Sequence, residues 1–467
     1  MTAFRRTASN FALEHAVAWA RQLRKPLLIV ETLSCDQRWA SDRHHAFVLD
    51  GMADNAAACR RADIRYYPYV ERQPGEQIDL LVALGSQACA IIADDFPIES
   101  VSAGVRRVAG RVNVRLEEVD SNGLMPLRAA DRVFPTASAF RRFLQRTLPD
   151  YLPEMPKPNP LARVGLPRAG GLPREITRRW PPAASRLLAA DPTALAGLPI
   201  THTIGRVAIR GGTLSARKTL RQFLKHKLAG YAGNRNHPDL DGTSGLSPFL
   251  HFGHISVHEV SRELAKAEGW SPPAVADTTT GRREGWWGMS ESAEGFLDEL
   301  VTWREVGLNR CAHAEDCDRY DSLPDWAKAT LAEHAADRRE YVYALGQFEH
   351  GRTHDRLWNA AQAQLVCEGR MHNYLRMLWG KKILQWSADP REALAVMIEL
   401  NNKYALDGQD PNSYSGIFWV LGRYDRPWGP QRPIFGKIRY MSSRNTARKL
   451  KLTEYLERYA SEEGREQ

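Results

Sequence analysis

EGRMHNYLRMLWGKKILQW, residues Glu368–Trp386, carries the most informative helical pattern of the C-terminal half. Its Trp379 and Trp386 stand seven residues apart, which on a helix places them roughly 10 Å apart along the axis and nearly on one face. Such a stripe is usually core packing. Together with Trp358, however, these large, oxidisable indoles can also relay an electron over a distance too long for one step. Both interpretations stay open at this point.

Helical spacing continues on both sides of this stretch, from about residue 201 onward. Leu220, Leu224 and Leu228 share a helical face. Asp389 and Pro390 carry the signature of a helix start, with a capping carboxylate followed by a first-turn proline. Ten of the 13 tryptophans lie beyond residue 200. The sequence therefore predicts an all-α C-terminal domain rich in tryptophan.

Residues 1–150 alternate between two periods instead. Short apolar runs typical of buried strands are separated by amphipathic helical segments, which favours a parallel sheet covered on both faces. The pattern lacks a G-x-G-x-x-G after any strand, so it does not predict a dinucleotide fingerprint. The predicted strands are 26–32, 64–70, 88–93 and 112–119, and the predicted helices are 12–23, 47–61 and 77–86.

Residues 151–200 hold ten prolines, which predicts an extended linker. We therefore expect three parts: an α/β domain over 1–150, a proline-rich linker over 151–200 and a helical domain over 201–467.

The composition excludes several protein classes. The 467 residues are 43% hydrophobic and 25% charged, unlike a disordered, fibrous or coiled-coil chain. No apolar run approaches the roughly 18 residues of a membrane helix, and Glu14 interrupts any signal peptide. The six cysteines form no C-x-x-C pair. We expect a cytoplasmic protein without a metal, although Cys311, His313 and Cys317 are spaced like metal ligands.

The net charge of +9 is concentrated in two blocks. Residues 160–230 hold 13 Lys and Arg against two acidic residues, and residues 423–451 hold nine against Asp425 alone. Two solvated basic surfaces would explain this pattern, but blocks this dense favour a nucleic acid as partner. Trp419 and Trp428 beside the second block suit a base stacked between aromatic rings, unless they are core residues.

Three further groups combine residue types that bind ligands. Thr243-Ser244-Gly245-Leu246-Ser247 precedes a helix and either caps it or holds a phosphate. Glu299 and Trp303, four residues apart, place a carboxyl beside an indole, whether as a proton donor or as a surface acid over a core ring. Arg376 and Asp407, with Asn401 and Asn402 nearby, form either a structural ion pair or a holder for a heterocycle's imide edge.

These motifs together resemble the photolyase/cryptochrome family, specifically its class II cyclobutane pyrimidine dimer photolyases. Besides Glu368–Trp386, the resemblance rests on WNAAQ (358–362), LNNKYALDGQDPNSYSG (400–416) and FGKIRYM (435–441). In the N-terminal half it rests on WASDRHHAFVLDGM (39–52). The resemblance implies a Rossmann-like α/β domain with a five-stranded parallel sheet and an all-α FAD-binding domain. It also implies a strand before the segment that here begins at Met1, so either the sheet lacks its first strand or the start lies upstream.

The resemblance also implies roles for single residues. The flavin would be held by Tyr231, Thr243, Ser244, Gly245, Leu246, Ser247, Arg376 and Asp407, with Asn401 facing flavin N5 and Asn412 as the alternative. Trp379, Trp358 and Trp386 would form the photoreduction relay, with Trp379 nearest the flavin. Glu299, Trp303, Met377 and Trp419 would line the dimer pocket. Asp425, Trp428, Arg423 and Arg426 would contact DNA.

The implied activity is that of a deoxyribodipyrimidine photolyase, a carbon–carbon lyase. Excited FADH⁻ gives an electron to a flipped-out dimer, the ring splits and the electron returns, while the antenna chromophore stays unassigned. We expect a monomer that binds damaged DNA and needs neither metal nor membrane. The alternatives are a cryptochrome-like photoreceptor without repair activity and a non-catalytic nucleic-acid-binding protein.

Overall fold

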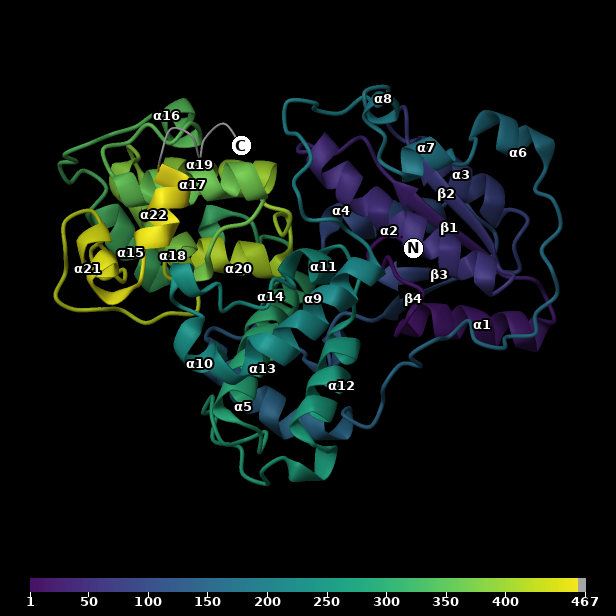
Figure 1. The fold of residues 1–467 in the computed structure, drawn as a ribbon, viewed down its shortest axis with the longest axis horizontal. Helices are drawn as coiled ribbons and strands as arrows, with labels where there is room; N and C mark the ends of the chain where they lie inside the picture. Colours follow the sequence, from purple (N-terminus) through teal and green to yellow (C-terminus); the bar gives the residue numbers. More distant parts are fainter. Residues whose placement is uncertain (461–467) are drawn as a thin grey trace. The chain divides into compact units, whose positions relative to one another are not determined.

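The computed structural model describes residues 1–460, which form two compact units (Figure 1). Unit 1 contains Met1–Ala130, Thr147–Gln222 and Gly245–Pro272. Unit 2 contains Asp131–Arg146, Phe223–Ser244 and the described chain from Pro273 onward. Within the described residues, no helix combines the length and apolarity needed to cross a membrane.

Unit 1 alternates strands and helices, and each of the four predicted strands is present within three residues of its predicted bounds. Helix α1 packs on β3 and β4, and α2 packs on β1 and β2. The elements are α1 (Phe11–Leu23), β1 (Leu28–Leu33), α2 (Asp42–Arg61), β2 (Arg65–Val70), α3 (Glu76–Gly85), β3 (Ala90–Asp95), α4 (Glu99–Ala109) and β4 (Arg115–Asp120), followed by α6 (Arg174–Arg179), α7 (Ser185–Leu188), α8 (Pro192–Leu195), α9 (Thr213–His226), α11 (Ser247–His251) and α12 (Val257–Glu268).

The prediction of one five-stranded sheet is wrong for the described residues. They contain two separate two-stranded parallel ladders, β1–β2 and β3–β4. The N-terminal segment lies against both ladders without forming a strand. The Met1 ammonium donates to the carbonyl of Val30 in β1 at 2.8 Å, while the N–H groups of Thr2, Ala3 and Phe4 converge on Asp94 Oδ2 in β3 at 2.7, 2.9 and 3.0 Å.

This convergence keeps residues 1–4 from pairing as a strand. A strand must direct its successive N–H groups to alternate sides to pair with its neighbours, whereas here three consecutive N–H groups face one buried carboxylate. Residues 1–4 are therefore held by a side chain and not by a ladder.

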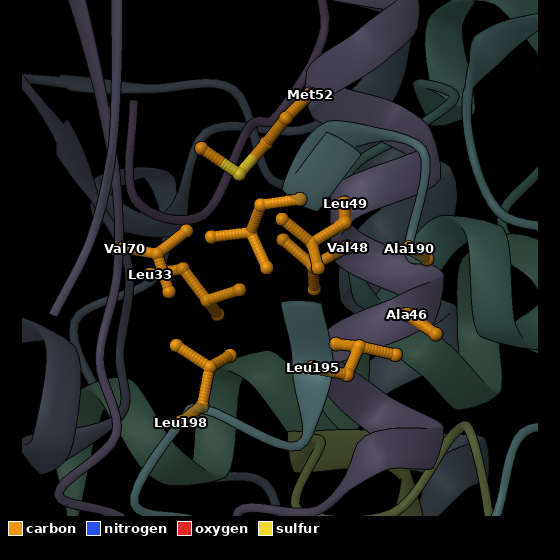
Figure 2. Close-up of a cluster of buried hydrophobic side chains, with 10 residues drawn as sticks. Leu33, Ala46, Val48, Leu49, Met52, Val70, Ala190, Leu195 and Leu198 are labelled. Atoms are coloured by element: carbon orange, nitrogen blue, oxygen red, sulfur yellow. The ribbon is translucent and has the colours of Figure 1, made fainter. Parts of the chain in front are cut away.

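The proline-rich segment contains short helices that contribute to the core of unit 1. Helix α8 begins with Pro192 at its first position and is capped by Asp191. Figure 2 shows the cluster in which Leu195 and Leu198 pack with Leu49 of α2 and Leu33 of β1. The outer edge of β2 is also covered, because the N–H of Ala183 donates to the carbonyl of Pro68. The segment is thus packed on the sheet and is not extended throughout.

The described residues of unit 2 form helices joined by loops. A π-helix, Asp298–Trp303, separates α13 from α14. The other helices are α5 (Ala137–Thr147), α10 (Tyr231–Asn234), α13 (Glu291–Leu297), α14 (Arg304–His313), α15 (Asp325–Glu333), α16 (Leu345–Glu349), α17 (Arg356–Glu368), α18 (Asn373–Trp386), α19 (Pro390–Tyr404), α20 (Pro411–Val420), α21 (Ser443–Lys449) and α22 (Thr453–Ala460).

Leu49→Ala is expected to destabilise unit 1 by about 2–5 kcal/mol, because it opens a cavity in a cluster where Leu49 is fully buried. Chemical unfolding followed by circular dichroism measures the change. The matched control is Leu214→Ala, whose side chain is 65% exposed and whose removal should change the free energy of unfolding by no more than about 0.5 kcal/mol. Equal effects of both changes would contradict the assignment of this core.

Candidate active site

Three buried tryptophans of unit 2 lie next to one another in a row. The rings of Trp379 and Trp358 are parallel, with an interplanar angle of 4° and centroids 6.4 Å apart. The ring of Trp386 lies 6.1 Å from that of Trp358 at 70°. The spatial order is therefore 379–358–386, because α17 inserts Trp358 between the two tryptophans of α18. Trp358 Nε1 donates to the carbonyl of Trp379 at 3.0 Å, and Trp379 Nε1 donates to Gln362 Oε1 at 2.9 Å.

Arg376, in the first turn of α18, forms a largely buried ion pair with Asp407, which follows α19. Arg376 donates to both carboxylate oxygens at 3.0 and 3.4 Å. On α19, Asn401 is 2% exposed, and its Nδ2 donates to Ser413 Oγ at 2.8 Å and to Asn402 Oδ1 at 3.2 Å. An amide has two protons to donate, so Asn401 has only its carbonyl oxygen left to offer a ligand. Asn412 is exposed at the start of α20.

The π-helix carries Glu299 and Trp303, both half-buried. Burial raises the pKa of the Glu299 carboxyl, and the guanidinium of Arg235 at 2.7 Å only partly opposes this. The π-helix is anchored to α5 by Asp298, which is paired with Arg141 at 2.7 Å. The extra residue in a π-turn shifts Glu299 relative to Trp303 from the α-helical spacing that the sequence implied.

The predicted phosphate-holding residues are spread along residues 231–247. Tyr231 is buried at the start of α10 and accepts a hydrogen bond from Arg235 at 3.4 Å. Burial raises the pKa of Tyr231 to about 12, with Glu299 adding to the effect. Thr243 and Ser244 end a segment of unit 2, and Gly245, Leu246 and Ser247 begin one of unit 1. Gly245 has a φ of +67°, a conformation that favours glycine. Leu246 is buried.

Trp419 of α20 has a buried cation beside it. Lys381 of α18 is fully buried, its Nζ donates to the carbonyl of Val420 at 2.5 Å, and it lies 4.9 Å from the centre of the Trp419 ring. Burial lowers the pKa of Lys381 to about 7, although Asp425 opposes the shift. Met377, one turn before Lys381, lies near Gly416 of α20. Lys381 holds the position of Trp419 through its ammonium group and its aliphatic chain.

A second aromatic–cationic group follows α20. Asp425 accepts hydrogen bonds from Arg439 at 3.0 and 3.3 Å and from Trp428 Nε1 at 3.1 Å. Burial opposes ionisation of Asp425, but these donors outweigh it and lower its pKa. The guanidinium of Arg439 lies 4.1 Å from the Trp428 ring and 5.4 Å from the Trp419 ring, and exposed Arg426 lies 4.6 Å from Trp428. These contacts pre-arrange a surface that offers both stacking and positive charge.

Arg423 is buried, which does not suit the DNA contact that was predicted for it. It is 4% exposed, donates to the carbonyl of Cys317 at 2.9 Å and stacks on Phe418 with its guanidinium 3.7 Å from the ring centre. Burial lowers the pKa of Arg423 to about 10. Its charge therefore serves internal packing in this structure and does not face a phosphate.

The elements that carry these residues pack on one another. The π-helix continues into α14, α14 packs on α20, and α20 packs on α18 and α19. Sequence analysis missed four residues that hold this group in place: Arg235, Gln362, Lys381 and Arg439. Three of them lie inside the motifs quoted above: Gln362, Lys381 and Arg439. The motifs themselves gave no indication of the contacts that these side chains make. Arg235 has no sequence signal beyond its closeness to Tyr231.

The fold belongs to a known class. The chain is similar to the crystal structure of a bacterial class III photolyase from Agrobacterium tumefaciens, with a TM-score of 0.66 and 16% identity over 97% of this chain and 84% of that one. This likeness defines a photolyase fold. No family model matches the chain.

Several curated relatives are more similar in sequence. A protein of Methanothermobacter thermautotrophicus named deoxyribodipyrimidine photo-lyase is 32% identical over 98% of this chain and 93% of its own length. Photo-lyases of Arabidopsis thaliana and Potorous tridactylus are each 32% identical over 97% of this chain, covering 86% and 79% of their own lengths. The chain therefore belongs to the deoxyribodipyrimidine photo-lyase family of enzymes.

Lys381→Met is expected to flatten the pH dependence of stability. Between pH 7 and 10.5 the unfolded chain holds the lysine proton and the folded chain does not, so the wild-type free energy of unfolding gains up to about 1.4 kcal/mol per pH unit from this group as pH rises. Urea unfolding at pH 7, 8 and 9 measures the slope. Lys218→Met, on an exposed side chain, is the control, and an unchanged slope in Lys381→Met would contradict the burial of a titrating lysine.

Proposed function

We propose that this protein repairs cyclobutane pyrimidine dimers in DNA with light, as a class II photolyase that uses FAD in its reduced form. The observation that carries the proposal is the half-buried Glu299, whose carboxyl is biased toward its protonated form on an element packed with the buried tryptophan helices. The similarity to photo-lyases along nearly the whole chain supports it. When bound, FADH⁻ supplies the light-excited electron that opens the dimer and takes it back.

The donor and acceptor chemistry of unit 2 fits a flavin ring. The Arg376–Asp407 pair presents a guanidinium and a carboxylate together, which suits the alternating acceptors and donor of an imide edge. The remaining acceptor of Asn401 suits an N–H, which flavin N5 carries only when the ring is reduced. We assign Tyr231, Thr243, Ser244, Gly245, Leu246 and Ser247 to the phosphate-bearing part of FAD.

Glu299 acts through a hydrogen bond to the substrate. Burial raises the pKa of its carboxyl and so favours the protonated form, which donates a hydrogen bond to a pyrimidine carbonyl. Arg235 limits the shift and orients the carboxyl. Trp303, Met377 and Trp419 add apolar surface that takes the two stacked bases out of water. The three tryptophans in a row, Trp379, Trp358 and Trp386, would pass electrons inward to restore the reduced cofactor.

DNA binds to the surface around Asp425, Trp428, Arg426 and Arg439 in this proposal. The exposed guanidinium of Arg426 contacts phosphate, and Trp428 offers a face to stacked bases. Arg423 leaves this set because it is buried.

We further propose an α/β domain at 1–150, a linker at 151–200 and a helical FAD-binding domain at 201–467. In this proposal the protein is a cytoplasmic monomer without a metal.

A cryptochrome-like photoreceptor would use the same tryptophan file. It has no need of a proton-holding carboxyl for a dimer, so Glu299 separates the two functions. Absence of dimer loss in an illuminated, reduced, flavin-loaded sample would favour the photoreceptor.

Glu299→Ala is expected to lower dimer repair by about tenfold, because the substrate carbonyl loses a donor. The measurement is the loss of cyclobutane dimers from an oligonucleotide illuminated with the FADH⁻-loaded protein. Glu333→Ala, an exposed acid on α15, is the matched control and should repair as wild type does. Full repair by Glu299→Ala would remove the proposed role of this carboxyl.

Arg426→Gln is expected to weaken DNA binding about threefold to tenfold and to reduce the slope of log affinity against log salt by about 1. Fluorescence anisotropy with a dimer-containing duplex at several salt concentrations measures both. Arg128→Gln, on a side chain that is 83% exposed and outside both basic blocks, serves as control. An equal loss in the two variants would show that the effect is one of net charge alone.

A further inference from the structure

The aromatic file does not end at Trp386. Tyr343, just before α16, has its ring 5.8 Å from that of Trp386, and His354, just before α17, lies 4.9 Å from it. Tyr341 stacks on His354 at 3.8 Å and is 37% exposed. Aromatic rings therefore follow one another from the buried Trp379 to the protein surface, at centroid spacings of 6.4 Å or less.

Tyr343 is placed to lose its proton when it loses an electron. Its Oη lies 2.8 Å from His354 Nδ1 and accepts a hydrogen bond from the backbone N–H of His354 at 3.1 Å. When the imidazole carries its hydrogen on Nε2, Nδ1 is an acceptor and the phenolic O–H of Tyr343 donates to it. The N–H of Tyr343 also donates to the carbonyl of Trp386 at 3.0 Å, which fixes the spacing of the two rings.

The two inner indoles have no comparable base on their N–H groups. Trp358 and Trp379 donate to amide oxygens, the backbone carbonyl of Trp379 and the side chain of Gln362. An amide oxygen accepts a hydrogen bond but does not take up a proton near neutral pH. A positive charge on these indoles is therefore not relieved locally by proton loss.

Charge around Trp386 favours moving the hole onward. Lys382 Nζ lies 5.1 Å from the centre of the Trp386 ring. A lysine ammonium at this distance raises the energy of a positively charged indole. Oxidised Tyr343 is a neutral radical once its proton has left, and the charge then resides on His354, which is exposed to water.

We propose that Tyr343 is the terminal electron donor of the tryptophan relay and that His354 receives its phenolic proton. This proposal rests on the proposed function, because the oxidant is the tryptophan relay after light-excited oxidised FAD has taken one electron from it. In the step, one electron passes from the Tyr343 phenol to oxidised Trp386 while the O–H bond breaks and an N–H bond forms at His354 Nδ1. The products are a neutral indole, a neutral phenoxyl radical and an imidazolium. A thiolate from solution later gives one electron to the phenoxyl radical and becomes a thiyl radical, and the imidazolium returns the proton to the phenolate oxygen.

Electron paramagnetic resonance of the FAD-loaded, full-length protein, frozen after illumination without DNA, tests this step. Wild type is expected to show a tyrosyl radical whose hyperfine pattern narrows when the protein contains ring-deuterated tyrosine. Tyr343→Phe should replace it with a tryptophan radical that recombines at least tenfold faster. His354→Phe should lower the tyrosyl signal at least fivefold with Tyr343 still present. Deuterium oxide should slow the decay of the wild-type tryptophan radical about twofold.

Tyr341→Phe is the matched control and should keep the tyrosyl signal. A long-lived tryptophan radical without a tyrosyl signal in wild type overturns the proposal, as does a tyrosyl signal that survives in Tyr343→Phe. If illumination yields no radical at all, no hole reaches Tyr343 and the proposal also fails. Failure of the proposed function is seen separately, because repair by chemically reduced protein does not need this relay.

Discussion

The close approach of α18 to its neighbours at Gly380 is the constraint on which the helical unit depends. A Cβ at this position would lie 2.6 Å from Val420 Cγ2 of α20 and 3.1 Å from Met397 Sδ of α19, so only glycine lets the three helices meet here. Gly307 has the same role between α14 and α20, where a Cβ would meet Ser415 Oγ at 2.7 Å. These contacts place the residues of α18 against those of α19 and α20.

Polar groups buried by this packing are satisfied in ways that serve the site. Asn401 is fixed by Ser413 and Asn402, and Lys381 by the carbonyl of Val420. Burying a lone cation opposes folding, which is why the pKa of Lys381 falls. A wholly apolar core would avoid this cost, but it would present neither an oriented amide nor an ion pair to a polar heterocycle.

Local patterns were sufficient for the elements and insufficient for their assembly. Short apolar runs predicted all four strands, because burial on both faces leaves a mark in consecutive residues. The predicted single sheet was wrong: the described strands pair as two separate ladders, and the N–H groups of residues 2–4 bind the Asp94 carboxylate and join neither ladder. Arg423 and Arg426 look alike in sequence, but only Arg426 is exposed, because Phe418 and the Cys317 carbonyl enclose the other guanidinium.

The family motifs and the basic block at 423–451 can be found from the sequence alone, because each consists of residue identities at fixed spacing. The spatial order of the tryptophans, with Trp358 between Trp379 and Trp386, is visible only in the folded chain, as is the contact of Tyr343 with His354 and Trp386. The physical reason is that such contacts join separate helices and loops. Their distances follow from how close the backbones come, which side-chain volume and glycine positions set together and no local period records.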